Sequence, residues 1–116
     1  MPNRNYVSGR FLEYSEKKFL ESKGYLVIRS AGSHTPVDLF AAHEKNKLLK
    51  RLFIQCKKSK NNNPKPPLSE AELKDFLRWT FVFRTEGIIS YKNKDGIHRF
   101  LLGIDLNLNP ISEDWF

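Results

Sequence analysis

The order in which helical and strand-like apolar patterns follow one another is the feature that most constrains what this chain can fold into. Apolar residues recur at helical spacing over about residues 9–23 and again over about 70–84. Five short β-type runs occupy the intervals around these stretches, at about residues 25–28, 37–42, 48–57, 87–91 and 97–104. The predicted order is therefore α-β-β-β-α-β-β. This order predicts a single α/β domain over residues 1–116, with a mixed central sheet flanked by helices.

Residues typical of caps and turns support these boundaries. Ser8 is the expected N-cap of the first helix, and Gly24 is the expected glycine after its last turn. Ser69 and Glu72 have the spacing of a capping box at the start of the second helix. The short polar link over residues 43–47 predicts that the second and third strands form a hairpin.

Composition narrows the classes of function. The 116 residues include 20 Lys and Arg against 13 Asp and Glu, and the net charge of +7 favours an anionic partner such as nucleic acid. The only cysteine, Cys56, excludes an intrachain disulfide, and three scattered histidines give no zinc motif of standard spacing. No apolar run approaches the ~18 residues needed to cross a membrane, and no signal-like stretch follows the N-terminus. We therefore expect a soluble, cytoplasmic protein without a membrane partner.

Polar residues interrupt two of the apolar strands. Asp38 lies within the run 37–42, and Gln55 and Lys57 lie at the end of the run 48–57. Because side chains alternate along a strand, Gln55 and Lys57 point to one side, and pairing of the two strands would bring Asp38 to them. A carboxylate and an amide oxygen are hard ligands for Mg²⁺, and a nearby lysine can orient water and offset negative charge. The trio suits phosphodiester hydrolysis, although a turn aspartate beside a solvated strand edge would give the same pattern.

This pattern resembles the PD-(D/E)XK nuclease superfamily, with Pro36-Val37-Asp38 as its first part and Gln55-Cys56-Lys57 as its second. Over about residues 7–105, the chain resembles the archaeal Holliday-junction resolvases more closely. The shared features are an early helical glutamate, a glycine, a short strand, the stretch Arg29-Ser30-Ala31-Gly32-Ser33 and a strand with Val37-Asp38-Leu39. The resemblance implies a restriction-endonuclease-like fold and a metal-dependent endonuclease that resolves four-way junctions by paired phosphodiester hydrolysis.

The resemblance also implies roles for individual residues. Glu13, Asp38 and Gln55 would bind Mg²⁺, for which Mn²⁺ can substitute, and Lys57 would be the catalytic lysine. The residues expected to contact the DNA backbone are Arg10, Arg29, Ser30 and Ser33. His34 lies in the loop before Asp38, and Lys58 and Lys60 follow Lys57 in the chain. We therefore add all three to the expected phosphate contacts. A homodimer is implied as well, with Phe76, Trp79 and Phe81 on the second helix as the expected contacts.

One departure from the resolvase pattern concerns Gln55, because the resolvases usually have glutamate at this position. Loss of that carboxylate weakens the negative field at the metal. However, Gln-x-Lys is the form found in Mrr-type restriction enzymes of the same superfamily, and an amide oxygen still coordinates Mg²⁺. Three alternatives stay open at this point: a restriction- or repair-type nuclease acting on duplex DNA, a catalytically inactive DNA-binding module, and a basic protein that binds RNA or another protein.

Overall fold

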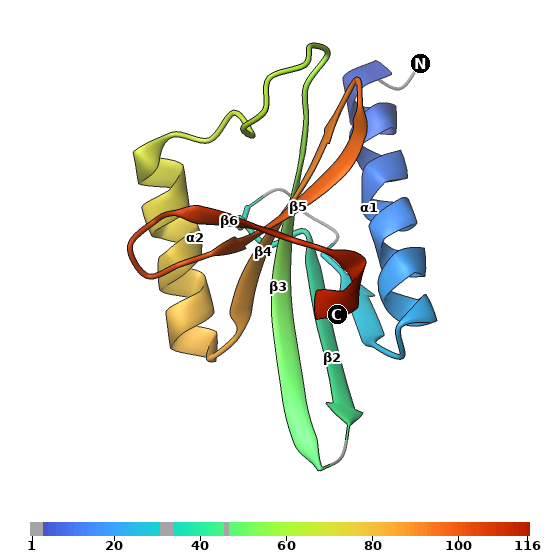
Figure 1. The fold of residues 1–116 in the computed structure, drawn as a ribbon, viewed down its shortest axis with the longest axis vertical. Helices are drawn as coiled ribbons and strands as arrows, with labels where there is room; N and C mark the ends of the chain where they lie inside the picture. The colour runs from blue at the N-terminus through green and yellow to red at the C-terminus, as the bar shows by residue number, and fades with distance from the viewer. Residues whose placement is uncertain (1–3, 31–33, 46) are drawn as a thin grey trace.

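Six strands form one sheet in chain order, with α1 against one face and α2 against the other (Figure 1). The computed structural model describes residues 4–30, 34–45 and 47–116, the first six of them by their helical backbone alone. The elements are α1 (Arg4–Ser22), β1 (Leu26–Arg29), β2 (Leu39–Lys45), β3 (Leu48–Lys58), α2 (Glu70–Phe83), β4 (Glu86–Asn93), β5 (Gly96–Leu102), β6 (Leu108–Ile111) and the 3₁₀ turn η1 (Glu113–Trp115).

The strand pairing follows from the connections. The pairs β1–β2, β2–β3, β4–β5 and β5–β6 each join strands that are consecutive in the chain, and each of these pairs is antiparallel. The α2 helix crosses between β3 and β4, and this pair is parallel. The predicted α/β class with a mixed sheet and the predicted β2–β3 hairpin are therefore confirmed.

The sixth strand was not predicted. Its four residues include Asn109 and Pro110, which are poor strand formers, so neither composition nor alternation marks the segment. Proline is tolerated because β6 is the edge strand of this sheet and pairs with β5. After β6, the C-terminal Trp115 and Phe116 pack against the α1 side of the sheet.

Each face of the sheet has its own buried cluster, because alternate side chains of a strand point to opposite faces. Leu52 and Ile54 of β3 pack on the α1 side with Leu20 of the helix, whereas Phe53 packs on the α2 side with Phe76. The central strands β3 and β4 are thus buried on both faces. These layers make β3 a rigid support for the polar residues at its end.

The boundaries of α1 differ from those predicted at one end only. The helix begins at Arg4, so Ser8 lies within it and is not the N-cap. At the other end, Gly24 has φ +96°, and the backbone N–H of Tyr25 donates to the carbonyl of Leu20 at 3.1 Å. This pattern is the expected glycine termination. The capping box at Ser69 is likewise present.

Two further corrections concern residues of functional interest. The β2 strand begins at Leu39, so Asp38 lies immediately before the strand, although its N–H still donates to the carbonyl of Ile54 at 2.9 Å. Phe76 is 0% exposed in the α2 core cluster, so it cannot contact a second subunit as predicted. Trp79 is half-buried and Phe81 is exposed. No helix in the described ranges is long and apolar enough to span a membrane.

Candidate active site

Asp38 is held against the end of β3. Its Oδ2 accepts a hydrogen bond from the backbone N–H of Cys56 at 2.7 Å. Cys56 separates Gln55 from Lys57, and its side chain packs toward the α1 side of the sheet. The start of β2 and the end of β3 therefore bring the carboxylate of Asp38 to the Gln55-Cys56-Lys57 tripeptide.

Glu13 reaches the same region from α1. Its side chain is 16% exposed, and its Oε2 lies 3.7 Å from Nη2 of Arg29 at the end of β1. Burial raises the pKa of Glu13, the charge of Asp38 raises it further, and the nearby Arg29 and Arg10 guanidinium groups oppose this rise. An effect of Asp38 on Glu13 requires the two carboxylates to be within electrostatic reach of each other.

The charge balance around Asp38 is similar. Burial raises the pKa of Asp38. The hydrogen bond from Cys56 and the charges of Lys57 and Arg29 act in the opposite direction, and they do not cancel the effect of burial. Two partly desolvated carboxylates are thus left with incomplete compensation, a state that a bound cation would relieve.

Gln55 precedes Cys56 on β3 and has a buried side chain. The residue is 8% exposed, and its Oε1 is buried without a hydrogen-bond partner in the described part of the chain. A buried acceptor without a partner is unfavourable, so this oxygen is suited to an incoming ligand. Carboxylate and amide oxygens such as those of Asp38, Glu13 and Gln55 are hard donors of the kind that Mg²⁺ prefers. Within the described ranges, no three His, Cys, Asp or Glu residues are grouped so that they could hold a metal ion.

Lys57 lies between the acids and α2. Its charge lowers the pKa of Asp38, and its Nζ lies 3.5 Å from Oε2 of Glu72. Sequence reasoning recognised Glu72 only as part of the capping box. Lys57 and Glu72 are 15 positions apart in the chain, and no local pattern signals this contact, which depends on how α2 crosses the sheet.

Comparison with known proteins identifies the family. A family model described as archaeal Holliday junction resolvase (Hjc) matches residues 4–109. The chain belongs to this resolvase family. It is therefore a nuclease of the Holliday junction resolvase type, and nucleases of this family are metal-dependent. A search of the curated proteins gives no match.

Two solved structures share the resolvase fold. Archaeoglobus fulgidus Hjc, a Holliday junction resolvase from an archaeal hyperthermophile, is 24% identical, with a TM-score of 0.63 over 81% of this chain and 72% of that chain. The structure of SSO0001 is 17% identical, with a TM-score of 0.56 over 97% of this chain and 56% of that chain. At these identities the two likenesses establish the fold alone.

The residues predicted to contact DNA divide into two groups in this resolvase. Arg10, His34, Lys58 and Lys60 are exposed. Arg29 and Ser30 are half-buried: Arg29 pairs with Glu13 and lies 5.0 Å from the ring centroid of Tyr14, and the N–H of Ser30 donates to the carbonyl of Asp38 at 2.9 Å. Ser33 lies outside the described residues. Ser30 therefore helps to fix the backbone of the site.

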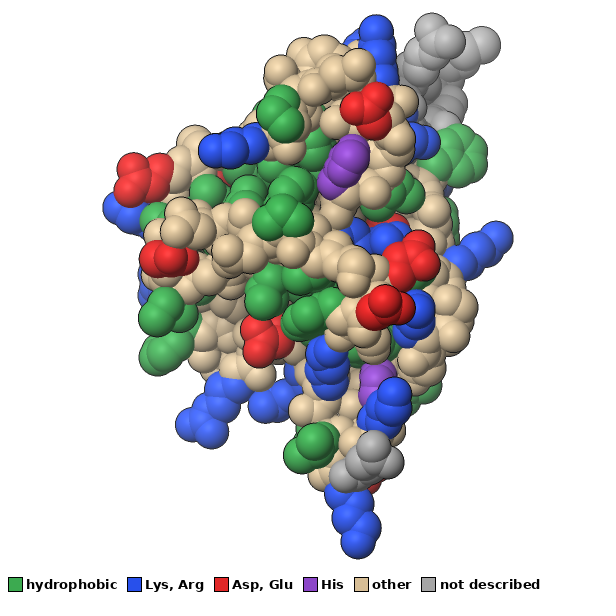
Figure 2. Space-filling view, in the orientation of Figure 1, with side chains coloured by type: hydrophobic (Ala, Val, Ile, Leu, Met, Phe, Trp, Pro, Cys, Tyr) green, Lys and Arg blue, Asp and Glu red, His purple; other side chains and the backbone are tan. Residues whose placement is uncertain are grey.

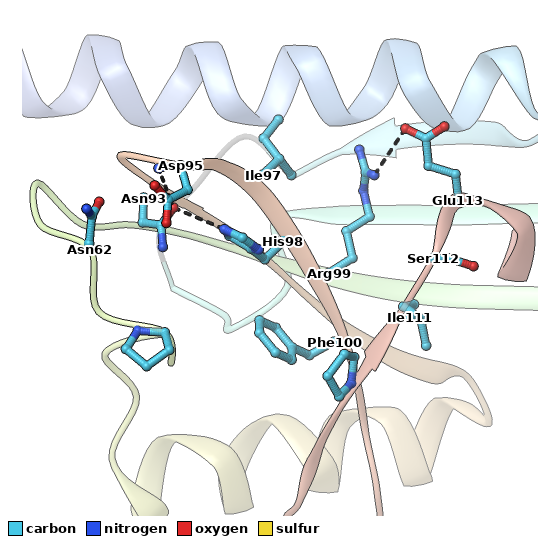
Figure 3. Close-up of a pocket in the computed structure, with 12 residues that line it drawn as sticks. Asn62, Asn93, Asp95, Ile97, His98, Arg99, Phe100, Ile111, Ser112 and Glu113 are labelled. Carbon is cyan, nitrogen blue, oxygen red and sulfur yellow. Dashed lines mark hydrogen bonds and ion pairs between the residues drawn. The ribbon is translucent and has the colours of Figure 1, made fainter.

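A separate hollow of about 530 Å³ lies between the Asn62 loop, β5 and β6 (Figure 3). Its polar groups contact one another: His98 Nε2 lies 3.0 Å from Asn93 Oδ1, and Arg99 lies 3.9 Å from Glu113. None of Glu13, Asp38, Gln55 and Lys57 lines this hollow. The candidate site is therefore distinct from it.

Proposed function

We propose that this resolvase hydrolyses the backbone of four-way DNA junctions at a Mg²⁺ site formed by Glu13, Asp38 and Gln55, with Lys57 as the catalytic lysine. The observation that carries the proposal is the hydrogen bond from the Cys56 N–H to Asp38 at 2.7 Å, which ties the acid to the tripeptide. The raised pKa values of Glu13 and Asp38 add to the case, because a divalent cation would offset the repulsion and desolvation of both carboxylates. Mn²⁺ has similar ligand preferences and would substitute.

The residues of the chain have distinct tasks in this mechanism. When bound, Mg²⁺ supplies Lewis-acid stabilisation of the scissile phosphate and lowers the pKa of an attacking water. Asp38 is kept in place by the backbone of β3, and Glu13 by its contact with Arg29. Lys57 places a positive charge beside Asp38, where it offsets the negative charge that develops on the phosphate and orients the water.

Gln55 is compatible with activity in this proposal. Glu13 and Asp38 together carry two negative charges when ionised, which matches the charge of one Mg²⁺ ion. Gln55 then contributes a neutral oxygen, and metal binding gives its buried Oε1 the partner that it lacks within the described ranges. The affinity for metal is expected to be lower than with a third carboxylate, since each added anionic ligand strengthens the binding of a divalent ion.

We further propose a homodimer that uses the C-terminal part of α2. Phe81, Val82 and Phe83 are 80%, 64% and 52% exposed, and the ring of Trp79 stacks on Phe83 with 5.6 Å between the centroids. Contiguous exposed apolar side chains are typical of protein contact sites. Two matched cuts in a junction require two active sites, and a two-fold symmetric dimer supplies them.

The DNA is expected to bind around the N-terminal half of α1 and the end of β3 with the residues that follow it, where Arg10, Lys58 and Lys60 are exposed. The face that carries β6 and η1 is less suitable. Figure 2 shows that hydrophobic side chains gather over its centre with acidic ones among them, while Lys and Arg project mostly from its rim. Contacts from lysines to phosphates position DNA without reading its sequence, so affinity should fall steeply with salt.

A cleavage assay with three substrates tests the proposal. A labelled four-way junction, a linear duplex and a single strand are each incubated with Mg²⁺ or EDTA, with the wild-type protein and the Asp38→Asn variant in parallel. We expect paired, Mg²⁺-dependent cuts near the branch point of the junction and none with Asp38→Asn. Cleavage by Asp38→Asn at the wild-type rate would contradict the assigned site. Stronger cleavage of linear duplex would favour a restriction- or repair-type nuclease, and junction binding without any cleavage would favour an inactive module.

A further inference from the structure

Glu72 connects the first turn of α2 to the proposed catalytic lysine. Its Oε2 lies 3.5 Å from Nζ of Lys57, and its Oε1 accepts hydrogen bonds from the N–H and Oγ of Ser69 at 3.3 and 3.1 Å. The Lys57 side chain is 29% exposed and that of Glu72 is 48% exposed. The capping box thus holds one oxygen of the carboxylate and leaves the other directed at Lys57.

This contact matters because of what stands at position 55. Residues 55 and 57 are two apart on β3, so their side chains share a face of the sheet. A glutamate at position 55 would place a carboxylate beside Lys57, whereas Gln55 offers only a neutral amide. Besides its electrostatic interaction with Asp38, Lys57 forms an ion pair with Glu72, a residue of a different element, the α2 helix.

We propose that Glu72 is a positioning residue for Lys57 and takes over the charge-pairing role that Gln55 lacks. The inference rests on the proposed function, in which Lys57 acts on the scissile phosphate. The ion pair with Glu72 restricts the long Lys57 side chain, which otherwise has many rotamers. A catalytic group that is already in position reacts faster than one that must first be ordered. The pair is partly exposed, so its contribution to folding stability is small and its effect should appear in catalysis.

The matched pair of variants is Glu72→Gln and Glu70→Gln. Glutamine at position 72 can keep the capping box, so Glu72→Gln removes only the charge that faces Lys57. Glu70 lies in the same helical turn, and its partner is Lys74 at 3.3 Å, on the helix surface. Glu70→Gln therefore makes the same change in charge near the helix N-terminus without touching the site.

The test is the single-turnover rate of junction cleavage with Mg²⁺. We expect Glu72→Gln to lower the rate constant by about 10- to 100-fold, the range found when residues that orient the groups of a metal site are replaced. The apparent dissociation constant for the junction should stay close to the wild-type value, and Glu70→Gln should have no effect on either quantity. Gln55→Glu should raise the rate by a larger factor in the Glu72→Gln background than in the wild type, because only there does it also return a carboxylate to the face of Lys57. Equal rates for Glu72→Gln and wild type would overturn the inference.

A spectroscopic measurement separates this inference from the proposed function. With isotopically labelled lysine, the side-chain NMR signal of Lys57, assigned through a Lys57→Arg variant, should shift in Glu72→Gln and stay unchanged in Glu70→Gln. An unchanged Lys57 signal in Glu72→Gln would overturn the positioning role, whatever the cleavage rates are. If the wild-type protein cleaves none of the three DNA substrates, the proposed function fails, and the NMR comparison alone still decides whether Glu72 positions Lys57.

Discussion

Two glutamates on α1, Glu13 and Glu16, lie one helical turn apart and have opposite environments. Glu16 is 2% exposed and fully engaged: Ser90 Oγ donates to it at 2.6 Å, and Arg99 donates from Nε at 2.8 Å and Nη2 at 2.7 Å. Glu13 forms a longer ion pair, to Arg29 at 3.7 Å, and faces the like charge of Asp38.

The difference shows how one helix serves both stability and chemistry. A buried carboxylate whose oxygens are all paired has no capacity left for a ligand, and it fixes the helix to the sheet. A carboxylate that is partly desolvated, and that faces another acid, is unfavourable in the free protein and becomes favourable when a cation binds. Glu16 therefore belongs to the scaffold, and Glu13 to the proposed site.

The largest expected effect is the loss of stability in Glu16→Ala. The substitution leaves the guanidinium group of Arg99 buried without its main partner, and breaking such a pair typically lowers the free energy of unfolding by about 3–5 kcal/mol. Chemical denaturation measures the effect. The control is Glu21→Ala, which removes an exposed partner of Lys17 at 3.7 Å and should change stability by less than about 0.5 kcal/mol. A loss in Glu16→Ala no larger than in the control would break the comparison.

The next effect concerns activity. Glu13→Gln is expected to slow junction cleavage by about 10²- to 10³-fold, the usual consequence of removing one group that stabilises charge in the transition state. Its free energy of unfolding should not fall, because the variant removes the repulsion between Glu13 and Asp38. Single-turnover cleavage and denaturation of the same sample provide both values. Wild-type cleavage by Glu13→Gln would remove Glu13 from the metal site.

The sequence predicted the α/β order, the hairpin and the meeting point of Asp38 with the tripeptide, because these depend on local periodicity and on strand alternation. It did not predict the role of Glu16. The partners of Glu16, Ser90 and Arg99, lie 74 and 83 residues away in the chain, and no local pattern connects them.

The same limit applies to the aromatic residues of α2. Phe76, Trp79 and Phe81 are close in sequence and similar in chemistry, and all three were predicted to contact a second subunit. The packing of α2 on the sheet separates them: Phe76 is 0% exposed, whereas Phe81 is 80% exposed. The sequence indicated only approximately which face of α2 packs on the sheet, because an apolar stripe this wide does not show which of its residues are buried.

The smallest expected effect is a rise of a few degrees in the Tm of Asp38→Asn at pH 7 to 8 without metal. The raised pKa of Asp38 means that the folded state holds its proton more tightly than the unfolded state does. The ionised carboxylate therefore destabilises the fold above its raised pKa, and this penalty disappears below the ordinary aspartate value of about 4. Asparagine removes the penalty and keeps an oxygen to accept the hydrogen bond from Cys56. The advantage of the variant should therefore shrink as the pH falls toward 4.

Mg²⁺ should make the wild type more stable than Asp38→Asn, because a ligand that binds only the folded state stabilises it. Calorimetric scans from pH 4 to 8, with Mg²⁺ or with EDTA, are expected to show a metal-dependent rise in Tm for the wild type and little or none for Asp38→Asn. Lower stability of Asp38→Asn at every pH, with no response of the wild type to Mg²⁺, would make Asp38 a structural carboxylate of the same kind as Glu16. Glu13 and Glu16 would then differ in solvent exposure and not in function.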